Sequence, residues 1–245
     1  MCIFVRHPIG QMHEVCRVYT SNPEVMTVKD NLRKISGTLP DGVQLVAITK
    51  TKSPEQIMEA YSAGHRVFGE SKAQELLPKY EALPKDIRWH MVGHLQSNKV
   101  KYIAPFISMI HSVDSLKLLK VINKEGRKNN RIIPCLLQIH IAEESTKFGL
   151  DKDDCVRLLE SEDLRTMEHV SIRGLMGMAT FTRDTEKVRR EFRGLKSFFD
   201  TIRQGYFSGR EEFRELSMGM SDDYLPGTAE GSTMVRIGSA LFGER

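Results

Sequence analysis

The sequence has no continuous hydrophobic run near the length of about 18 residues that crosses a bilayer as a helix. Close to the N-terminus, residues 2–5 are apolar, but Arg6, His7 and Pro8 break the run at once. Such a segment is too short for the apolar core of a secretory signal. We therefore expect no membrane partner and a cytoplasmic location.

Cysteine is scarce, and the four residues stand apart at Cys2, Cys16, Cys135 and Cys155. The chain contains no CxxC pair and no metal-ligand spacing between a cysteine and a histidine, so we expect free thiols in a reducing compartment. His90 and His94 are four residues apart, but the segment between them is typical of a strand and a loop. A helix would be needed to present both imidazoles on one face, so no metal site is expected.

Aromatic residues make up only 7% of the chain and are scattered, and neither sign of charge dominates. The 36 basic and 32 acidic residues are spread along the whole length and leave a net charge of +4. Nucleic-acid-binding proteins usually concentrate Lys and Arg in one stripe with aromatic residues between them. We therefore expect no nucleic-acid partner, whereas a small basic pocket for an anionic ligand agrees with this composition.

The 245 residues, 40% hydrophobic and 28% charged, are enough for one large globular domain. Residues 1–25 show no clear period and are expected to form an N-terminal extension, which leaves residues 26–245 for the domain. After the turn signal at residues 40–42, short β-rich runs alternate with longer amphipathic stretches. The predicted strands are residues 43–49, 66–68, 88–92, 108–111, 132–139, 171–176, 215–217 and 234–237.

Helical patterns lie before the first strand and between the others. They cover residues 31–35, 54–63, 72–80, 98–106, 115–127, 151–160, 185–204 and 224–230. Ser53, Ser115 and Asp184 stand where helix N-caps are expected. Eight consecutive βα units predict an α/β fold, a single (β/α)8 barrel, in which functional loops follow the carboxyl ends of the strands.

Lys50 directly follows the first predicted strand, where its ammonium would project at the mouth of the barrel. An amine held there can attack an aldehyde and form a Schiff base. Lys52 has the same parity along the chain and is a rival, so the pattern does not separate the two lysines. A solvated lysine at a strand end is the simpler interpretation when this segment is taken alone.

The last strand and the residues after it predict an anion site. A β-rich run leads into Gly238 and Ser239 and then into a short apolar turn of helix, an arrangement with which barrels cradle phosphate on backbone N–H groups. Gly238 lets the backbone approach an anion closely, and Ser239 adds a hydroxyl. Arg236 must point into the barrel or find a partner, because burying it unpaired is costly. A glycine loop without a ligand is the alternative.

Two further serines follow predicted strands. Ser217 ends the seventh strand and is placed to give a second phosphate contact, although residues 217–221 could instead form a mere tight turn. Ser71 follows the second strand after Gly69 and Glu70 and faces the same mouth by position. The alternative role for Glu70 and Ser71 is to cap the next helix.

Six segments taken together resemble the pyridoxal phosphate homeostasis protein family: residues 47–52, 68–70, 93–99, 111–115, 216–221 and 231–238. The resemblance implies a barrel like the N-terminal domain of alanine racemase, with pyridoxal 5′-phosphate (PLP) bound to Lys50 as a Schiff base. It also implies that Arg236 faces the pyridine nitrogen and that Ser217, Gly238 and Ser239 hold the phosphate.

The chain departs from the family pattern at Ser71, where the family usually has asparagine. The ring-side contact of that asparagine does not carry over, and Ser71 is kept as a candidate contact in its place.

These residues favour binding of the cofactor over turnover. An arginine cannot protonate the pyridine nitrogen as an aspartate would, so the ring is a poor electron sink. The predicted function is a monomeric carrier in PLP homeostasis, without catalytic residues, that passes PLP to apo-enzymes. The alternative is a PLP-dependent amino-acid racemase. A racemase needs a second, β-rich domain with a tyrosine base, for which a chain ending at Arg245 is expected to leave no room.

Overall fold

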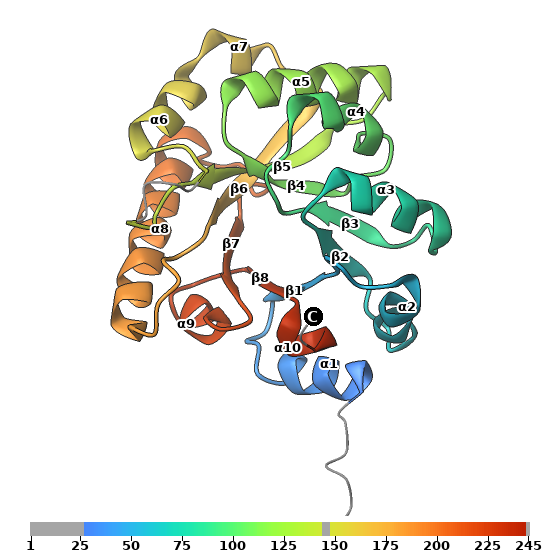
Figure 1. Ribbon diagram of the computed structural model, residues 1–245. Coiled ribbons are helices and arrows are strands. Elements are labelled where there is room, and N and C mark those ends of the chain that lie inside the picture. The colour runs from blue at the N-terminus through green and yellow to red at the C-terminus, as the bar shows by residue number, and fades with distance from the viewer. Residues whose placement is uncertain (1–26, 144–147, 244–245) are drawn as a thin grey trace, which may run out of the picture.

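Eight parallel strands close into one barrel in the computed structural model, which describes residues 27–143 and 148–243 (Figure 1). Each strand pairs with the next in sequence, and β1 pairs with β8 to close the ring. The strands are β1 Gln44–Ile48, β2 Val67–Glu70, β3 Arg88–Met91, β4 Met109–Val113, β5 Ile133–Ile139, β6 Val170–Gly177, β7 Glu215–Met220 and β8 Met234–Ile237. The predicted (β/α)8 barrel is confirmed. The predicted N-terminal extension, residues 1–25, lies outside the described residues.

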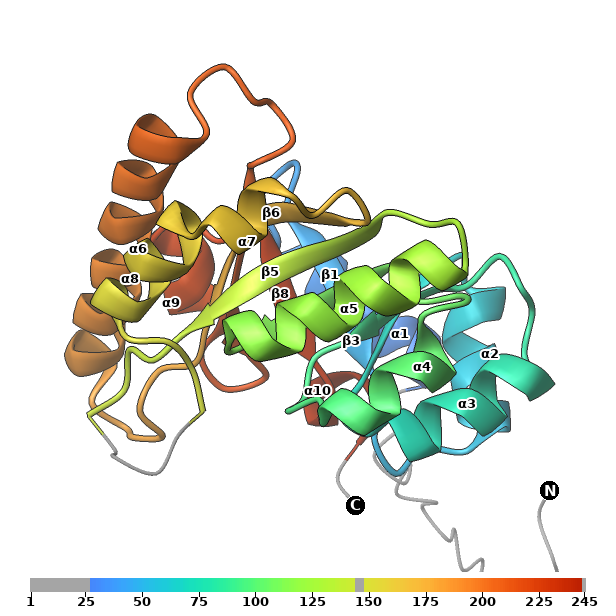
Figure 2. The ribbon, with the colours of Figure 1, turned by 90° about the horizontal axis from the view of Figure 1, so that it is seen from above.

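Helices surround the strands on the outside of the barrel (Figure 1), and the turned view places the long helix α8 on the side opposite α2 and α3 (Figure 2). They are α1 Val28–Ser36, α2 Pro54–Ser62, α3 Ala73–Ala82, α4 Val100–Ile103, α5 Leu116–Lys128, α6 Lys152–Glu160, α7 Glu162–Arg165, α8 Thr185–Tyr206, α9 Tyr224–Ala229 and α10 Ser239–Phe242, with a 3₁₀ turn at Ser97–Lys99. Ser53, Ser115 and Asp184 act as N-caps, as expected, because each accepts a hydrogen bond from a backbone N–H of its helix. Within the described ranges no helix combines the length and the hydropathy that a bilayer crossing requires.

Several elements differ in length from their sequence patterns, and two of these differences have a clear cause. The pattern over residues 98–106 predicts one helix, whereas the structure has the 3₁₀ turn followed by α4, which ends at Ile103. Pro105 explains the early end, since it has no backbone N–H to donate to a carbonyl of the preceding turn. Strand β7 runs three residues past the predicted end at Ser217, because its pairing with β8 continues to Met220, which lies opposite Arg236.

The two faces of the barrel wall are packed differently, because alternate residues of a strand point to opposite sides. On β3, Trp89 is buried in the large apolar cluster between the strands and the helices, whereas its neighbour His90 lies on the inner face. Val46, Ile48 and Val67 form a second, smaller cluster on the inner face. The barrel interior therefore contains polar side chains as well as apolar ones.

The closure between β1 and β8 brings distant parts of the sequence together. Val46 on β1 is in register with Arg236 on β8. Beyond the strands, α1 lies beside α10 (Figure 1), and the side-chain amide of Asn31 donates a hydrogen bond to the carbonyl of Leu241 at 3.0 Å. The loops that follow the first and last strands are therefore neighbours at the carboxyl end of the barrel.

Candidate functional site

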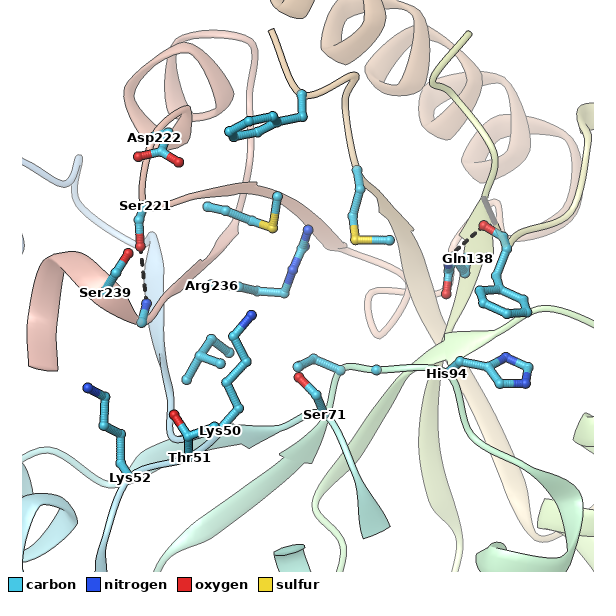
Figure 3. Close-up of a pocket in the computed structure, with 18 of the residues that line it drawn as sticks. Lys50, Thr51, Lys52, Ser71, His94, Gln138, Ser221, Asp222, Arg236 and Ser239 are labelled. Carbon is cyan, nitrogen blue, oxygen red and sulfur yellow. Dashed lines mark hydrogen bonds between the residues drawn. The ribbon is translucent and has the colours of Figure 1, made fainter. Parts of the chain in front are cut away.

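A cavity of about 450 Å³ opens at the carboxyl ends of the strands (Figure 3). Its wall is formed by residues Ile48, Lys50, Thr51, Lys52, Ser71, Val92, Gly93, His94, Gln138, Phe148, Met178, Phe181, Met220, Ser221, Asp222, Arg236, Gly238, Ser239 and Gly243. Five of the six predicted site residues are among them: Lys50, Ser71, Arg236, Gly238 and Ser239. The structure therefore joins segments that are up to about 190 positions apart in the sequence.

The structure separates the two rival lysines. The side chain of Lys50 extends into the cavity toward Arg236 (Figure 3). Lys52 also lies at the wall, but its ammonium donates a hydrogen bond to the carbonyl of Gly243 at 2.9 Å, at the end of α10. Thr51 between them has φ of 64°, a left-handed conformation that is rare for a β-branched residue. This turn is one reason why the two side chains diverge.

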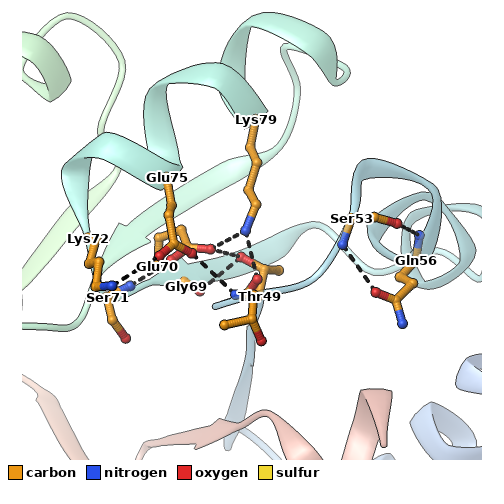
Figure 4. A network of polar contacts seen from close by, with 10 residues as sticks. Thr49, Ser53, Gln56, Gly69, Glu70, Ser71, Lys72, Glu75 and Lys79 are labelled. Atoms are coloured by element: carbon orange, nitrogen blue, oxygen red, sulfur yellow. Dashed lines mark hydrogen bonds and ion pairs between the residues drawn. The ribbon is translucent and has the colours of Figure 1, made fainter. Parts of the chain in front are cut away.

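A buried ion pair fixes the strand ends beneath Lys50 (Figure 4). The carboxylate of Glu70, at the end of β2, is fully buried and pairs with the ammonium of Lys79 on α3. Glu70 also accepts hydrogen bonds from the Thr49 hydroxyl and from the backbone N–H of Ser71, each at 2.9 Å. A buried carboxylate is costly unless it is paired and hydrogen-bonded, so these contacts are difficult to break. They therefore hold Thr49, the residue before Lys50, and the backbone of Ser71 in place.

A candidate anion cradle lies between the ends of β7 and β8. The hydroxyl of Ser221 accepts a long hydrogen bond from the backbone N–H of Gly238, at 3.3 Å (Figure 3). It accepts a second one from the backbone N–H of Ala240, at 3.5 Å. Ser239 begins α10 and lines the same part of the cavity. Backbone N–H groups and hydroxyls that converge at the start of a helical turn form a favourable environment for a phosphate.

Ser217 is the one predicted site residue that the structure does not bring to the cavity wall. Its side chain is fully buried inside the barrel, where the hydroxyl contacts His111 and Arg236. Ser221, four positions later, lines the cavity wall instead. The sequence pattern predicted that β7 ends at residue 217, whereas the strand ends at Met220. Ser221 is the first residue after that end, and its position is the signal that could have identified it.

Arg236 lies at the base of the cavity and is only 4% exposed. Its Nη1 donates to the Ser217 hydroxyl at 2.7 Å, and its Nη2 donates to the carbonyl of Gly177 at 3.1 Å. Burial lowers the pKa of Arg236 to about 10, although the nearby Asp223 acts in the opposite direction. The guanidinium thus remains charged at neutral pH and can offer its other N–H groups to an acceptor in the cavity.

The opposite wall is formed by residues that the sequence analysis did not assign to the site. His94 stacks on Phe148 with ring centroids 4.1 Å apart, and its Nδ1 lies 3.1 Å from a carboxylate oxygen of Asp114. Gln138 on β5 donates to the carbonyl of Phe148 at 2.8 Å. Histidines 90 and 94 are thus engaged separately, one inside the barrel and one at the rim. Among the described residues no cluster of three or more His, Cys, Asp or Glu side chains is arranged to hold a metal ion.

Comparison with known proteins places the chain in a family. The alanine racemase N-terminal domain family matches residues 25–245. The pyridoxal phosphate homeostasis protein of Aquifex aeolicus (strain VF5) is 40% identical over 205 residues, which cover 82% of this chain and 87% of that protein. The chain belongs to the pyridoxal phosphate homeostasis protein family. The resemblance drawn from the six sequence segments is confirmed.

Solved structures agree with this family membership. PipY of Synechococcus elongatus PCC7942, whose structure was determined with PLP bound, has 33% sequence identity and a TM-score of 0.80, covering 89% of this chain and 100% of PipY. Alanine racemase from E. faecalis has a TM-score of 0.69 at 15% identity, and the match covers 89% of this chain and 58% of the racemase. At that identity the racemase shows a shared barrel fold and nothing further.

Proposed function

We propose that this protein binds PLP in the cavity, holds it through a covalent link to Lys50, and acts in PLP homeostasis as a carrier of the cofactor. The observation that carries the proposal is the Lys50 side chain, which extends into the same cavity that contains Arg236 and the anion cradle. The homeostasis protein of Aquifex aeolicus and the PLP-bound PipY structure support it.

The groups at the cavity wall match the chemical groups of PLP. Ser221, Ser239 and the backbone N–H of Gly238 would hold the phosphate, because they converge on one side of the cavity. Arg236 would donate to the pyridine nitrogen from the base of the cavity. When bound, PLP supplies an aldehyde carbon that a primary amine joins reversibly with loss of water. Lys50 offers the primary amine, and Ser71 stands at the wall beside it.

A carrier fits these residues better than a racemase. Arg236 keeps its proton at neutral pH, with a pKa of about 10, so it donates a hydrogen bond without giving a proton to the ring. A ring nitrogen that stays unprotonated withdraws electrons weakly, which disfavours carbanion chemistry. The cavity-lining residues in the described ranges include no tyrosine to serve as a second base. The proposal therefore assigns Lys50 to attachment of the cofactor and names no catalytic residue.

The proposal also covers the extent of the binding unit, its location, its oligomeric state and the recipients of PLP. We infer that residues 26–245 act as one PLP-binding unit in the cytoplasm, as a monomer, and that the recipients are apo-enzymes that depend on PLP. The buried thiols of Cys135 and Cys155 are free, which agrees with a reducing compartment. Light scattering of the purified protein tests the monomer, and reactivation of an apo-enzyme by the PLP-loaded protein tests the transfer.

A spectroscopic experiment tests the attachment to Lys50. PLP added to the purified protein should produce a visible absorption band that borohydride reduction removes, and mass spectrometry should find the reduced adduct on Lys50. Lys50→Ala should lose the band, whereas Lys52→Met should keep it. A band of full intensity in Lys50→Ala, with the adduct on Lys52, would overturn the assignment.

A second experiment separates the carrier from the racemase. The PLP-loaded protein is incubated with single enantiomers of alanine and of several other amino acids, and the enantiomeric ratio is followed by chiral chromatography. A carrier leaves the ratio unchanged over many equivalents of substrate. Sustained racemisation that disappears in Lys50→Ala would establish the enzyme instead.

A further inference from the structure

A row of hydrogen-bonded polar side chains crosses the inside of the barrel below the cavity. It consists of His90 on β3, His111 on β4, Ser217 on β7 and Arg236 on β8, and each is at most 4% exposed. Barrel interiors are usually filled by bulky branched apolar side chains. Polar groups in such a place destabilise the fold unless each has a partner, so the arrangement of these partners is informative.

Three hydrogen bonds join the row. Arg236 Nη1 donates to the Ser217 hydroxyl at 2.7 Å. The Ser217 oxygen lies 3.0 Å from Nδ1 of His111, and Nε2 of His111 lies 2.9 Å from Nδ1 of His90. The contact between His111 and Ser217 spans the barrel, because β5 and β6 separate their strands along the wall.

The direction of these hydrogen bonds follows from Arg236, because a guanidinium can only donate. Ser217 accepts from Arg236 and has one hydrogen of its own, which it can give to Nδ1 of His111. A neutral His111 that accepts at Nδ1 carries its proton on Nε2 and donates to Nδ1 of His90. The opposite direction would make the Ser217 oxygen accept twice and would leave its hydrogen outside the row.

The charge state of the two histidines agrees with this direction. Burial lowers the pKa of His90 to about 3, and Arg88 contributes to the same effect. Burial also places the pKa of His111 well below its usual value, and His90 and Arg236 lower it further. Both rings are therefore neutral at neutral pH, and a neutral ring can accept at one nitrogen while it donates at the other.

Arg236 is thus fixed from two sides, by the Ser217 hydroxyl and by the carbonyl of Gly177. A long, flexible side chain held at two of its N–H groups has lost most of its freedom to turn, and Arg236 lines the cavity in this fixed position. Resting on the PLP-binding function proposed above, we propose that His111 and Ser217, supported by His90, are positioning residues that aim the Arg236 guanidinium at the ligand.

Substitutions of the residues that hold Arg236 test the proposal, and the binding of PLP is measured by titration followed by absorbance. His111→Leu removes the acceptor for Ser217, and Ser217→Ala removes the link itself at little change in volume. Both variants should bind PLP on Lys50 about tenfold more weakly, because they loosen a contact to a charged group. Their visible band should also move, since the ring nitrogen loses a fixed donor. His111→Asn keeps an acceptor at the Nδ1 position and should restore most of the affinity and the band position.

A measurement on the ligand-free protein tests independently which groups donate and which accept in the row of hydrogen bonds. With ¹⁵N-labelled histidine, NMR should find His111 neutral and protonated on Nε2. Circular dichroism and thermal unfolding identify any variant that fails to fold, and Ser217→Ala decides the matter if His111→Leu is such a variant. Wild-type affinity and band position in folded Ser217→Ala, or an Nδ1-protonated His111, would overturn the inference. Absence of the band in the unsubstituted protein would instead overturn the proposed function.

Discussion

Lys79 on α3 donates a hydrogen bond from its ammonium to the carbonyl of Thr49, 2.7 Å away, and so ties a helix outside the barrel to the residue before Lys50. The same ammonium pairs with the buried carboxylate of Glu70. One side chain therefore connects the helix layer, the end of β1 and the end of β2. Removal of the Lys79 side chain should lower the stability of the fold and loosen the backbone next to Lys50.

Lys79→Met should destabilise the protein by about 3–5 kcal/mol, because it leaves the Glu70 carboxylate buried without its partner. The free energy of unfolding is measured by urea denaturation. Lys72→Met is the matched control near the start of the same helix, since Lys72 is 70% exposed and its pair with Glu75 is at the surface. That change should cost less than about 1 kcal/mol. Equal effects of the two substitutions would contradict a special role for the buried pair.

Gly69→Ala should destabilise the barrel by about 1–3 kcal/mol through overpacking. A Cβ at this position would lie 2.7 Å from Cδ1 of Ile48 and 2.9 Å from Cγ1 of Val46, on the inner face of the wall. Gly194 in α8 is the control, because nothing lies within 4 Å of a Cβ built there. Gly194→Ala should stabilise the helix by about 0.5–1 kcal/mol. Thermal unfolding of the two variants gives the comparison.

Ser221→Ala should weaken the binding of PLP by about tenfold, because it removes a hydroxyl from the anion cradle. Pyridoxal, which has no phosphate, serves as the control ligand. Its much weaker binding should be the same in Ser221→Ala and in the unsubstituted protein. Fluorescence or absorbance titration measures both ligands, and an equal loss for pyridoxal would place Ser221 outside the phosphate site.

The stability of the protein should decrease as the pH falls from about 6.5 toward 3. The pKa of His90 is lowered by burial from 6.5 to about 3, so in this window the unfolded chain binds a proton that the folded chain does not. Acid therefore favours unfolding, and the contribution is fully present only above the unfolded pKa. His90→Gln should flatten the dependence of the unfolding free energy on pH in this range. An unchanged slope in the variant would exclude His90 as a source.

Much of the fold could be predicted from the sequence, because each strand is a short apolar run bounded by turn residues. All eight strands lie where the pattern placed them, and β8 was predicted with its observed bounds. The limits came from the ends of elements. The predicted end of β7 was three residues short, so Ser217 was predicted at the cavity, whereas the structure places Ser221 at its wall.

The remaining features depend on contacts that no local pattern contains. Parity gave Lys50 and Lys52 the same standing, and the left-handed turn at Thr51 belongs to the folded loop. The hydrogen bond between His111 and Ser217 joins residues 106 positions apart across the barrel, so neither residue by itself indicated it. Long-range pairing of this kind is set by the closed sheet and not by the adjacent residues.

The pairing of β1 with β8 also has a consequence for how the protein is made. Lys50 leaves the ribosome well before Arg236, Gly238 and Ser239, which belong to the opposite end of the barrel sequence. A nascent chain can form βα units as it emerges, yet it has no complete binding cavity until its final strand closes the ring. The proposed uptake of PLP therefore requires the closed barrel and not merely its separate βα units.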